Sequence, residues 1–356
     1  MIDILKKWYH RYFNEEESVL LLFLLLGALL LLMLLGDVLA PVFVAIVLAY
    51  LMQGVANQLV SFGFSARIGV WISTLLFMGA FFAFSLGLVP LVWRQLVSLL
   101  REAPKMVEEG RHILSMLNQN YPTMISQDQI NQLVAAMQRE MGQFGQQVLT
   151  VGLSSIPSVL AVLVYMVLIP LMVFFLLKDR EKIVNWSLSF LPAERPLLKQ
   201  IWAEINQQFA NYARGKVIEI IIVGGASYVA FSIFGLNYAA LLALLVGLSV
   251  IIPYIGATLV TIPVIFVAFF QWGDAPDFYY VFIAYAVIQV LDGNVLVPLL
   301  FSEAVNLHPI AIIVAVLFFG GIWGVWGVFF AIPLATIVNA IVRAWPTQYH
   351  LERINS

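Results

Sequence analysis

One acidic residue, Asp292, stands inside the otherwise apolar stretch LDGNVLVPLL at residues 291–300. It is the only charged residue between Phe278 and Ser302. A carboxylate at the centre of a lipid bilayer costs about 2.5–3.5 kcal/mol on insertion scales, unless water, a polar partner or an ion meets it. Gln289 and Asn294 add amide groups nearby, and the stretch holds no lysine or arginine that could pair with the acid. These groups are suited to line a path for a polar solute or a cation.

The residues around Asp292 also weaken a helix. Gly293 and Pro298 disfavour regular helical hydrogen bonding, and irregular backbone at membrane depth is tolerated only where protein or a water-filled cavity surrounds it. We therefore expect an unwound segment in which Asp292, Asn294, Gln289 and Pro298 line a substrate pathway. The alternative is that Asp292 caps a half-helix and never meets a solute.

A second interrupted segment is expected at IIPYIGA, residues 251–257, followed by TIP at 261–263. Pro253 and Gly256 would expose backbone carbonyls there, and two broken segments in one half of the chain suggest a shared site. The alternative is kinking that serves helix packing alone. The glycines of GGIWGVWG, residues 320–327, are expected to let another helix approach closely.

Two further titratable residues follow in FSEAVNLHP, residues 301–309. Glu303 is either a gating residue or a solvated loop acid, and His308 either gates or makes a loop hydrogen bond. Glu219 is expected to extend toward the cytoplasmic interface near Lys216, which leaves Asp292 as the only acid deep in the membrane. The four histidines lack metal-site spacing, the chain has no cysteine, and no nucleophile–base pair or phosphate loop occurs, so we expect no cofactor, no metal and no enzyme.

The composition demands lipid around much of the protein. Of the 356 residues 62% are hydrophobic and 11% charged, and the mean hydropathy is +0.96. A net charge of -2 argues against nucleic acid as a partner. A spanning helix needs about 20 mostly apolar residues. Runs of this kind lie at 19–35, 38–60, 68–93, 154–177, 217–234, 238–271, 278–300 and 309–342.

The expected fold is therefore an all-α polytopic membrane protein with about eight transmembrane helices, some of them broken or re-entrant. Runs 238–271 and 309–342 are too long for one straight helix, and a break is also expected at Gly36–Asp37. Between spans, residues 94–150 have the periodicity of a helical insertion, with an apolar face listed as Ile130, Leu133, Met137, Met141, Phe144 and Val148.

The distribution of lysine and arginine orients the chain. Three basic residues precede the first span and seven lie in 178–216, which places both regions in the cytoplasm. The expected organisation is an interfacial helix and three spans in 1–93, an extracytoplasmic helical segment in 94–150 and a fourth span in 151–177. A cytoplasmic helical segment follows in 178–216. Residues 217–356 hold the last four spans, with broken segments, and a cytoplasmic tail.

Four stretches resemble the autoinducer-2 exporter family. They are PLMVFFLLKDREKI (170–183), LNYAALLALLVGLSVIIPYIGA (236–257), LDGNVLVPLLFSEAVNLHP (291–309) and GGIWGVWGVFFAIPLA (320–335). The N-terminal pattern and SEAVNLHP are closest to its PerM-like permease branch. Many members read D-N-x-x-x-P; Asn294 and Pro298 match this pattern, the acid is displaced by one residue to Asp292, and Val297 stands where an arginine is common. The resemblance implies a multi-span inner-membrane protein that assembles as a ring-like homo-oligomer, a pentamer.

Three functions remain open from the sequence. The first is a permease that exports a small polar molecule such as autoinducer-2, with a neutral solute suited to the scarcity of basic residues in the spans. The second is a sodium/proton antiporter in which Asp292 binds either cargo. The third is a membrane scaffold without transport, which would dock partners on the 94–150 helices.

Overall fold

The computed structural model describes residues 16–120, 127–153, 156–191, 196–252, 255–301 and 307–344. Helices joined by short turns make up this part of the chain, and no strand occurs in these ranges. The chain divides into two compact units. Unit 1 comprises Met1–Leu76, Leu168–Val217 and Pro298–Ser356, and unit 2 comprises Phe77–Val167 and Ile218–Val297.

Seven helical segments in the described ranges are long and apolar enough to cross a membrane. They are Val19–Gly36, Val38–Ser61, Ala66–Arg111, Leu198–Ile233, Ile255–Trp272, Pro276–Phe301 and Pro309–Arg343. Leu163–Lys178 and Ala239–Ser249 are apolar but shorter. The all-α polytopic membrane fold expected from the sequence is confirmed.

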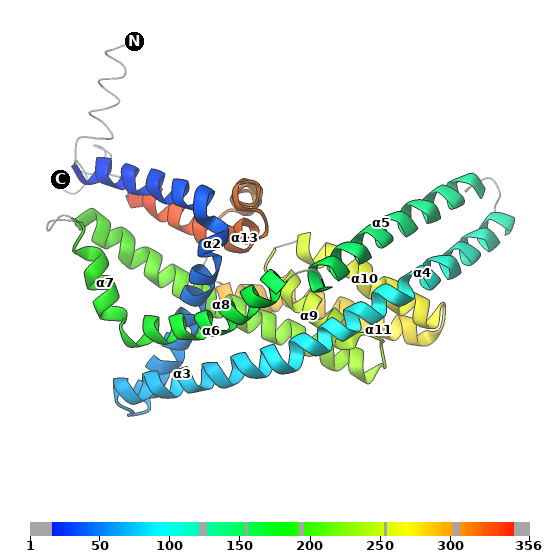
Figure 1. Cartoon of the computed structure of the whole chain (residues 1–356), viewed down its shortest axis with the longest axis horizontal. Coiled ribbons are helices and arrows are strands. Elements are labelled where there is room, and N and C mark those ends of the chain that lie inside the picture. The colour runs from blue at the N-terminus through cyan, green and yellow to red at the C-terminus, as the bar shows by residue number, and fades with distance from the viewer. Residues whose placement is uncertain are drawn as a thin grey trace, which may run out of the picture. The chain divides into compact units, whose positions relative to one another are not determined.

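The first two expected spans form one helix, α2 (Glu16–Ser61), in unit 1. The break expected at Gly36–Asp37 is wrong, because the helical hydrogen bonding continues through these residues. Figure 1 shows the two halves of α2 running in different directions, and Pro41 lies inside the helix. A proline removes one backbone donor, which is a common cause of a helix bend. The other helices wholly within unit 1 are α7 (Arg180–Leu188) and α13 (Pro309–Ala344).

Helix α13 is kinked at Gly324, whose φ of 59° and ψ of -137° are accessible almost only to glycine. The two halves point in different directions in Figure 1, where the first is seen end-on. A Cβ on Gly327 would overlap the backbone of Phe319, so the glycines let the two halves of one segment meet. The interruption of the 309–342 run is as expected. The glycines, however, allow two parts of α13 to approach each other, whereas the approach of another helix was expected. Trp323 packs beside it against Phe330, with ring centroids 5.6 Å apart.

In unit 2, a long helical hairpin extends from the apolar helices. Helix α3 (Ala66–Ala83) continues through the π-helical turn η1 (Phe84–Leu88) into α4 (Val89–Asn120), and α5 (Gln127–Leu153) runs back along α4. Figure 1 shows α4 and α5 side by side. Helix α6 (Ile156–Lys178) follows the hairpin.

Apolar contacts join the two helices of the hairpin, and Ile130 of the expected apolar face takes part in them. Ile130 and Val134 of α5 are buried against Val107 of α4 and Phe266. Of the other residues listed for this face, Leu133, Met137, Met141, Phe144 and Val148 have side chains outside the described ones. The extracytoplasmic location of the hairpin remains a prediction.

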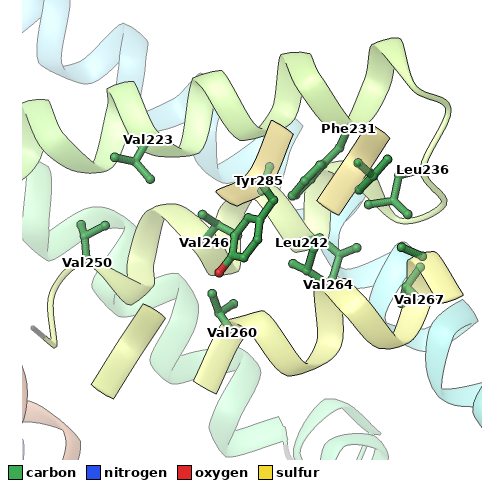
Figure 2. Packing of buried hydrophobic residues seen from close by; sticks show 13 residues of the cluster. Val223, Phe231, Leu236, Leu242, Val246, Val250, Val260, Val264, Val267 and Tyr285 are labelled. Carbon is green, nitrogen blue, oxygen red and sulfur yellow. The ribbon is translucent and has the colours of Figure 1, made fainter. Parts of the chain in front are cut away.

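The core of unit 2 is built from α8 (Pro196–Ile233), α9 (Ala239–Ser249), α10 (Ile255–Trp272) and α11 (Pro276–Leu291). Helix α8 is continuous from the polar 196–216 segment into the apolar one. Figure 2 shows the buried cluster between these helices, which consists of Val223, Phe231, Leu236, Leu242, Ala243, Val246, Val250, Val260, Val264, Val267, Ala268, Val281 and Tyr285. This buried cluster, called the dry cluster below for its apolar side chains, fixes the helix faces that position the candidate site.

The expected interruption of the 238–271 run is present between α9 and α10. Gly256, in the first turn of α10, is buried, and its N–H donates to the carbonyl of Ile252 over 2.9 Å. A Cβ on Gly256 would lie 2.7 Å from the carbonyl carbon of Ser249, well inside ordinary carbon contact. Glycine is therefore required because the two helix ends touch through their backbones.

Polar side chains brace the turn from α8 to α9. The amide of Gln271 accepts from the N–H of Asn237 (2.7 Å) and donates to the carbonyl of Gly235 (2.8 Å). Gln95 of α4 accepts from the N–H of Leu241 (2.8 Å), which satisfies one of the free donors at the start of α9.

Tyr238 precedes α9 in the left-handed conformation, with φ of 58°. Burial, with a hydrogen bond to the Glu102 carboxylate as the second cause, raises the pKa of Tyr238 to about 12. A tyrosine in this conformation is uncommon, and its contact with α4 fixes the strained residue.

Candidate functional site

Asp292 begins a π-helical turn, η2 (Asp292–Leu296), which joins α11 to α12 (Val297–Phe301). The expected unwound segment is therefore wrong in form, since the chain stays helical with one residue added to the turn. The N–H of Val297 donates to the carbonyl of Asp292, and the Asn294 amide donates to the carbonyl of Val290 over 2.9 Å. Such turns keep backbone groups satisfied where Pro298 removes a donor, and they are frequent at functional sites.

The capping role considered for Asp292 does not fit this backbone. An N-cap residue has non-helical dihedral angles, whereas Asp292 has φ of -60° and ψ of -58°. No half-helix begins there, because α11 runs into η2 without a break. The Asp292 side chain is half-buried within a candidate membrane span.

Helix α11 runs antiparallel to the unit 2 part of α8. The rings of Phe231 and Tyr285 lie 6.4 Å apart, and those of Phe234 and Tyr280 lie 6.2 Å apart. A step forward on α8 thus corresponds to a step backward on α11. Figure 2 shows Tyr285 beside α8, near Phe231.

This register places polar residues of the two helices at neighbouring levels along the pair. One helical turn from the Phe231–Tyr285 contact, in the same direction along the pair, lie Ser227 on α8 and Gln289 on α11. One turn farther lie Val223 on α8 and Asp292 after α11, and Glu219 lies one turn beyond Val223. We call Glu219, Ser227, Gln289 and Asp292 the α8–α11 seam.

Glu219 corrects the sequence interpretation. Its side chain is only 2% exposed, so it does not extend to an aqueous interface as expected. The ammonium group of Lys216 lies over the Phe301 ring, 4.9 Å from its centroid. Asp292 is consequently not the only acid deep in the apolar helices. A signal for this was available, because Glu219 and Ser227 lie eight residues apart on the face that also carries Val223.

Two seam atoms are buried without a hydrogen bond to any described residue. They are the hydroxyl oxygen of Ser227, a residue with 0% exposure, and the amide nitrogen Nε2 of Gln289. An unsatisfied buried polar group costs about 1–3 kcal/mol. The seam therefore has hydrogen-bonding capacity that the described packing does not use.

A hydroxyl pair links α11 to the start of α10. The Tyr285 hydroxyl and Thr261 Oγ1 lie 2.7 Å apart, and Thr261 Oγ1 donates to the carbonyl of Ala257 over 2.7 Å. Ala257 follows Gly256, which the sequence predicted as a site residue of the second interrupted segment. Gly256 therefore lies on α10, and α10 contacts α11 through this hydroxyl pair. Figure 2 shows the Tyr285 hydroxyl directed toward α10.

The remaining expected site residues lie elsewhere or outside the described ranges. Pro253 and Glu303 are outside them. His308 belongs to unit 1, is exposed, and accepts from the N–H of Ile310 through Nδ1 over 3.3 Å, which caps the start of α13. This is the loop hydrogen bond considered for it, and its gating role remains a prediction. Within the described ranges, no three His, Cys, Asp or Glu side chains gather as a metal site.

Comparison with known proteins gives consistent matches over most of the chain. A sequence model for AI-2E family transporters matches residues 19–347. A protein of Escherichia coli K12 named "Putative permease PerM" is 46% identical over 346 residues, which cover 97% of this chain and 98% of that protein. Two proteins of Bacillus subtilis, "Putative transport protein YueF" and "Putative transport protein YrrI", are 26% and 25% identical and cover 84% and 85% of this chain.

The names of the family and of these relatives indicate transport and not enzymatic catalysis. They agree with the apolar helices in indicating a multi-pass protein of the bacterial inner membrane. With a family match over nearly the whole chain and 46% identity to a full-length relative, this protein belongs to the AI-2E transporter family.

Proposed function

We propose that this protein exports a small polar molecule from the cytoplasm, and that the solute passes along the α8–α11 seam. The observation that carries the proposal is the half-buried carboxylate of Asp292 in the π-helical turn of a candidate span. A charge at membrane depth is costly and faces the interior of a helix bundle or a water-filled cavity. The π-helical turn adds a local change of helix geometry at that position.

The charges of the seam favour a neutral solute. Residues 218–233 and 276–296 contain no lysine, arginine or histidine, while Glu219 and Asp292 are both acidic. An anionic solute would meet two like charges in a weakly screening environment. Amide, hydroxyl and carboxylate groups can instead hydrogen-bond a neutral polar molecule such as autoinducer-2.

Transport by the purified protein in sealed proteoliposomes tests the proposal. We expect efflux of autoinducer-2 or a neutral pentose, and we expect Asp292→Asn to slow it by less than about tenfold because the amide keeps most of the hydrogen bonding. Asp277→Asn, at the exposed start of the same helix, is the matched control and should transport normally. Unchanged efflux after joint replacement of Asp292 and Asn294 by Ala, at normal protein levels, would refute the pathway.

The same vesicles separate export from antiport. A sodium/proton antiporter would release protons when sodium is added, and Asp292→Asn would abolish that release since the acid must bind both cargoes. Export of a neutral solute predicts no such proton release.

Membrane orientation and assembly complete the proposal. Both termini would lie in the cytoplasm and the α4–α5 hairpin outside it, in accordance with the basic residues of 178–216. The family resemblance supports a ring-like homo-oligomer, proposed as a pentamer. Native mass spectrometry of the detergent-solubilised protein tests this, and a monomer at all concentrations would refute it.

A further inference from the structure

The seam contains two polar side chains with unused hydrogen-bonding capacity, which a bound solute could satisfy. Ser227 and Gln289 each lie one helical turn from the Phe231–Tyr285 contact, so they lie at the same level along the antiparallel pair. Ser227 Oγ and Gln289 Nε2 are buried, yet neither has a hydrogen-bond partner among the described residues. The neighbouring core cluster is almost wholly apolar, and the hydroxyl of Tyr285 in it is already paired with Thr261.

Chemistry limits what can satisfy this pair. A serine hydroxyl and a glutamine amide each donate and accept hydrogen bonds, as the hydroxyl groups of a neutral solute also do. A metal ion would require several acidic or imidazole ligands together, and the described residues show no group of three. A solute with adjacent hydroxyls could bond both side chains at once.

Two carboxylates lie beyond the pair along the helices, both on the side away from the Phe231–Tyr285 contact. Asp292 follows Gln289 by one turn, and Glu219 precedes Ser227 by two turns on the same face of α8. Residues 218–233 and 276–296 contain no basic residue, so the charges that ionised Glu219 and Asp292 bring to this part of the helices are negative. A neutral molecule or a cation can approach, while an anion is repelled.

We propose that Ser227 and Gln289 form a hydrated binding site for neutral, hydroxyl-bearing solutes, from which Glu219 and Asp292 exclude anions. This inference rests on the proposed function and assigns the contact residues and the ligand chemistry of that pathway. Ser227 binds the solute from α8, and Gln289 binds it from α11.

The absence of cysteine from the whole chain allows a direct test with single thiols. Ser227→Cys is nearly isosteric, and Gln289→Cys gives a second thiol at the same site. Val246→Cys is the control, since Val246 is 0% exposed in the dry cluster of the same unit. Each variant is reconstituted as the full chain and treated with cationic aminoethyl and anionic sulfonatoethyl methanethiosulfonate. Only a hydrated thiol ionises and reacts quickly.

We expect both site thiols to react at least about tenfold faster with the cationic than with the anionic reagent, after correction for their rates with a free thiol. Val246→Cys should react with neither. Ribose at twice its dissociation constant should slow modification about threefold, because two thirds of the sites are then occupied. Ribonate, the matched anion, should not protect.

Three results would overturn the inference. They are site thiols as unreactive as Val246→Cys in monodisperse protein, equal corrected rates for both reagents, and no protection by ribose at any concentration. If the thiols are unreactive while wild-type vesicles still export solute, this site is wrong and the proposed function stands. If wild-type vesicles export neither autoinducer-2 nor a pentose, the proposed function itself fails.

Discussion

The contact between α9 and α10 at Gly256 yields a quantitative prediction for Gly256→Ala. The added Cβ would lie 2.7 Å from the carbonyl carbon of Ser249 and 3.1 Å from its Cα. Carbon atoms in contact are normally about 3.5–4.0 Å apart, so one backbone must move by about 1 Å. Ser249 offers backbone at this point, and backbone cannot rotate away as a side chain can. We expect a loss of about 3 kcal/mol, at the upper end of overpacking costs.

The assay is the fraction of detergent-solubilised protein that stays monodisperse after heating, measured by size-exclusion chromatography. A loss of 3 kcal/mol should lower the midpoint by roughly 6–12 °C if unit 2 unfolds cooperatively. Gly225→Ala is the matched control, because Gly225 is exposed in α8 and a Cβ there meets nothing within 4 Å. That variant should be unchanged or more stable by about 0.5–1 kcal/mol. Equal midpoints for Gly256→Ala and Gly225→Ala would refute the close contact.

Two tyrosines give further predictions. Tyr285→Phe loses the hydrogen bond to Thr261 and should cost about 0.5–1.5 kcal/mol in the same assay, while Tyr228→Phe on the exposed face of α8 should cost nothing; equal losses would exclude the hydroxyl pair. The raised pKa of Tyr238, about 12 in the folded state against 10 in the unfolded chain, means that the folded protein holds this proton more tightly. The contribution of this proton to stability is therefore complete below pH 10 and lost between pH 10 and 12. The stability of the Tyr238→Phe variant should consequently decrease less steeply with pH than that of the wild type over this window. Parallel stability curves for the two proteins would contradict the contact with Glu102.

Much of the helical architecture could be predicted because its causes are local. Apolar run length identified the spans, and the three- and four-residue period placed Ile130 on a buried face. The interruption near Gly256 and the kink at Gly324 were foreseeable from glycine and proline. The form of the backbone at Asp292 could not be foreseen. Glycine and proline weaken a regular helix, but they do not indicate whether the chain unwinds or gains one residue in a π-helical turn.

The seam itself depends on pairing between distant segments. Glu219 lies three residues after Lys216, and a charge so close to a basic residue at the end of a span is normally expected to reach water. Its burial follows from the face shared with Ser227 and Phe231, and only the contact of Phe231 with Tyr285 reveals what that face meets. Sequence reasoning therefore identified Asp292 and Gln289 in one segment, placed Glu219 of the other helix wrongly and missed Ser227.

The central claim is that the α8–α11 seam is hydrated and meets solute. A density map of the purified protein in lipid nanodiscs, at a resolution that shows ordered water, tests this most directly. The account predicts non-protein density within hydrogen-bonding distance of Ser227 Oγ and Gln289 Nε2, continuous with a cavity that reaches Asp292. Dry packing around all three side chains, with their polar atoms bonded only to protein, would contradict it.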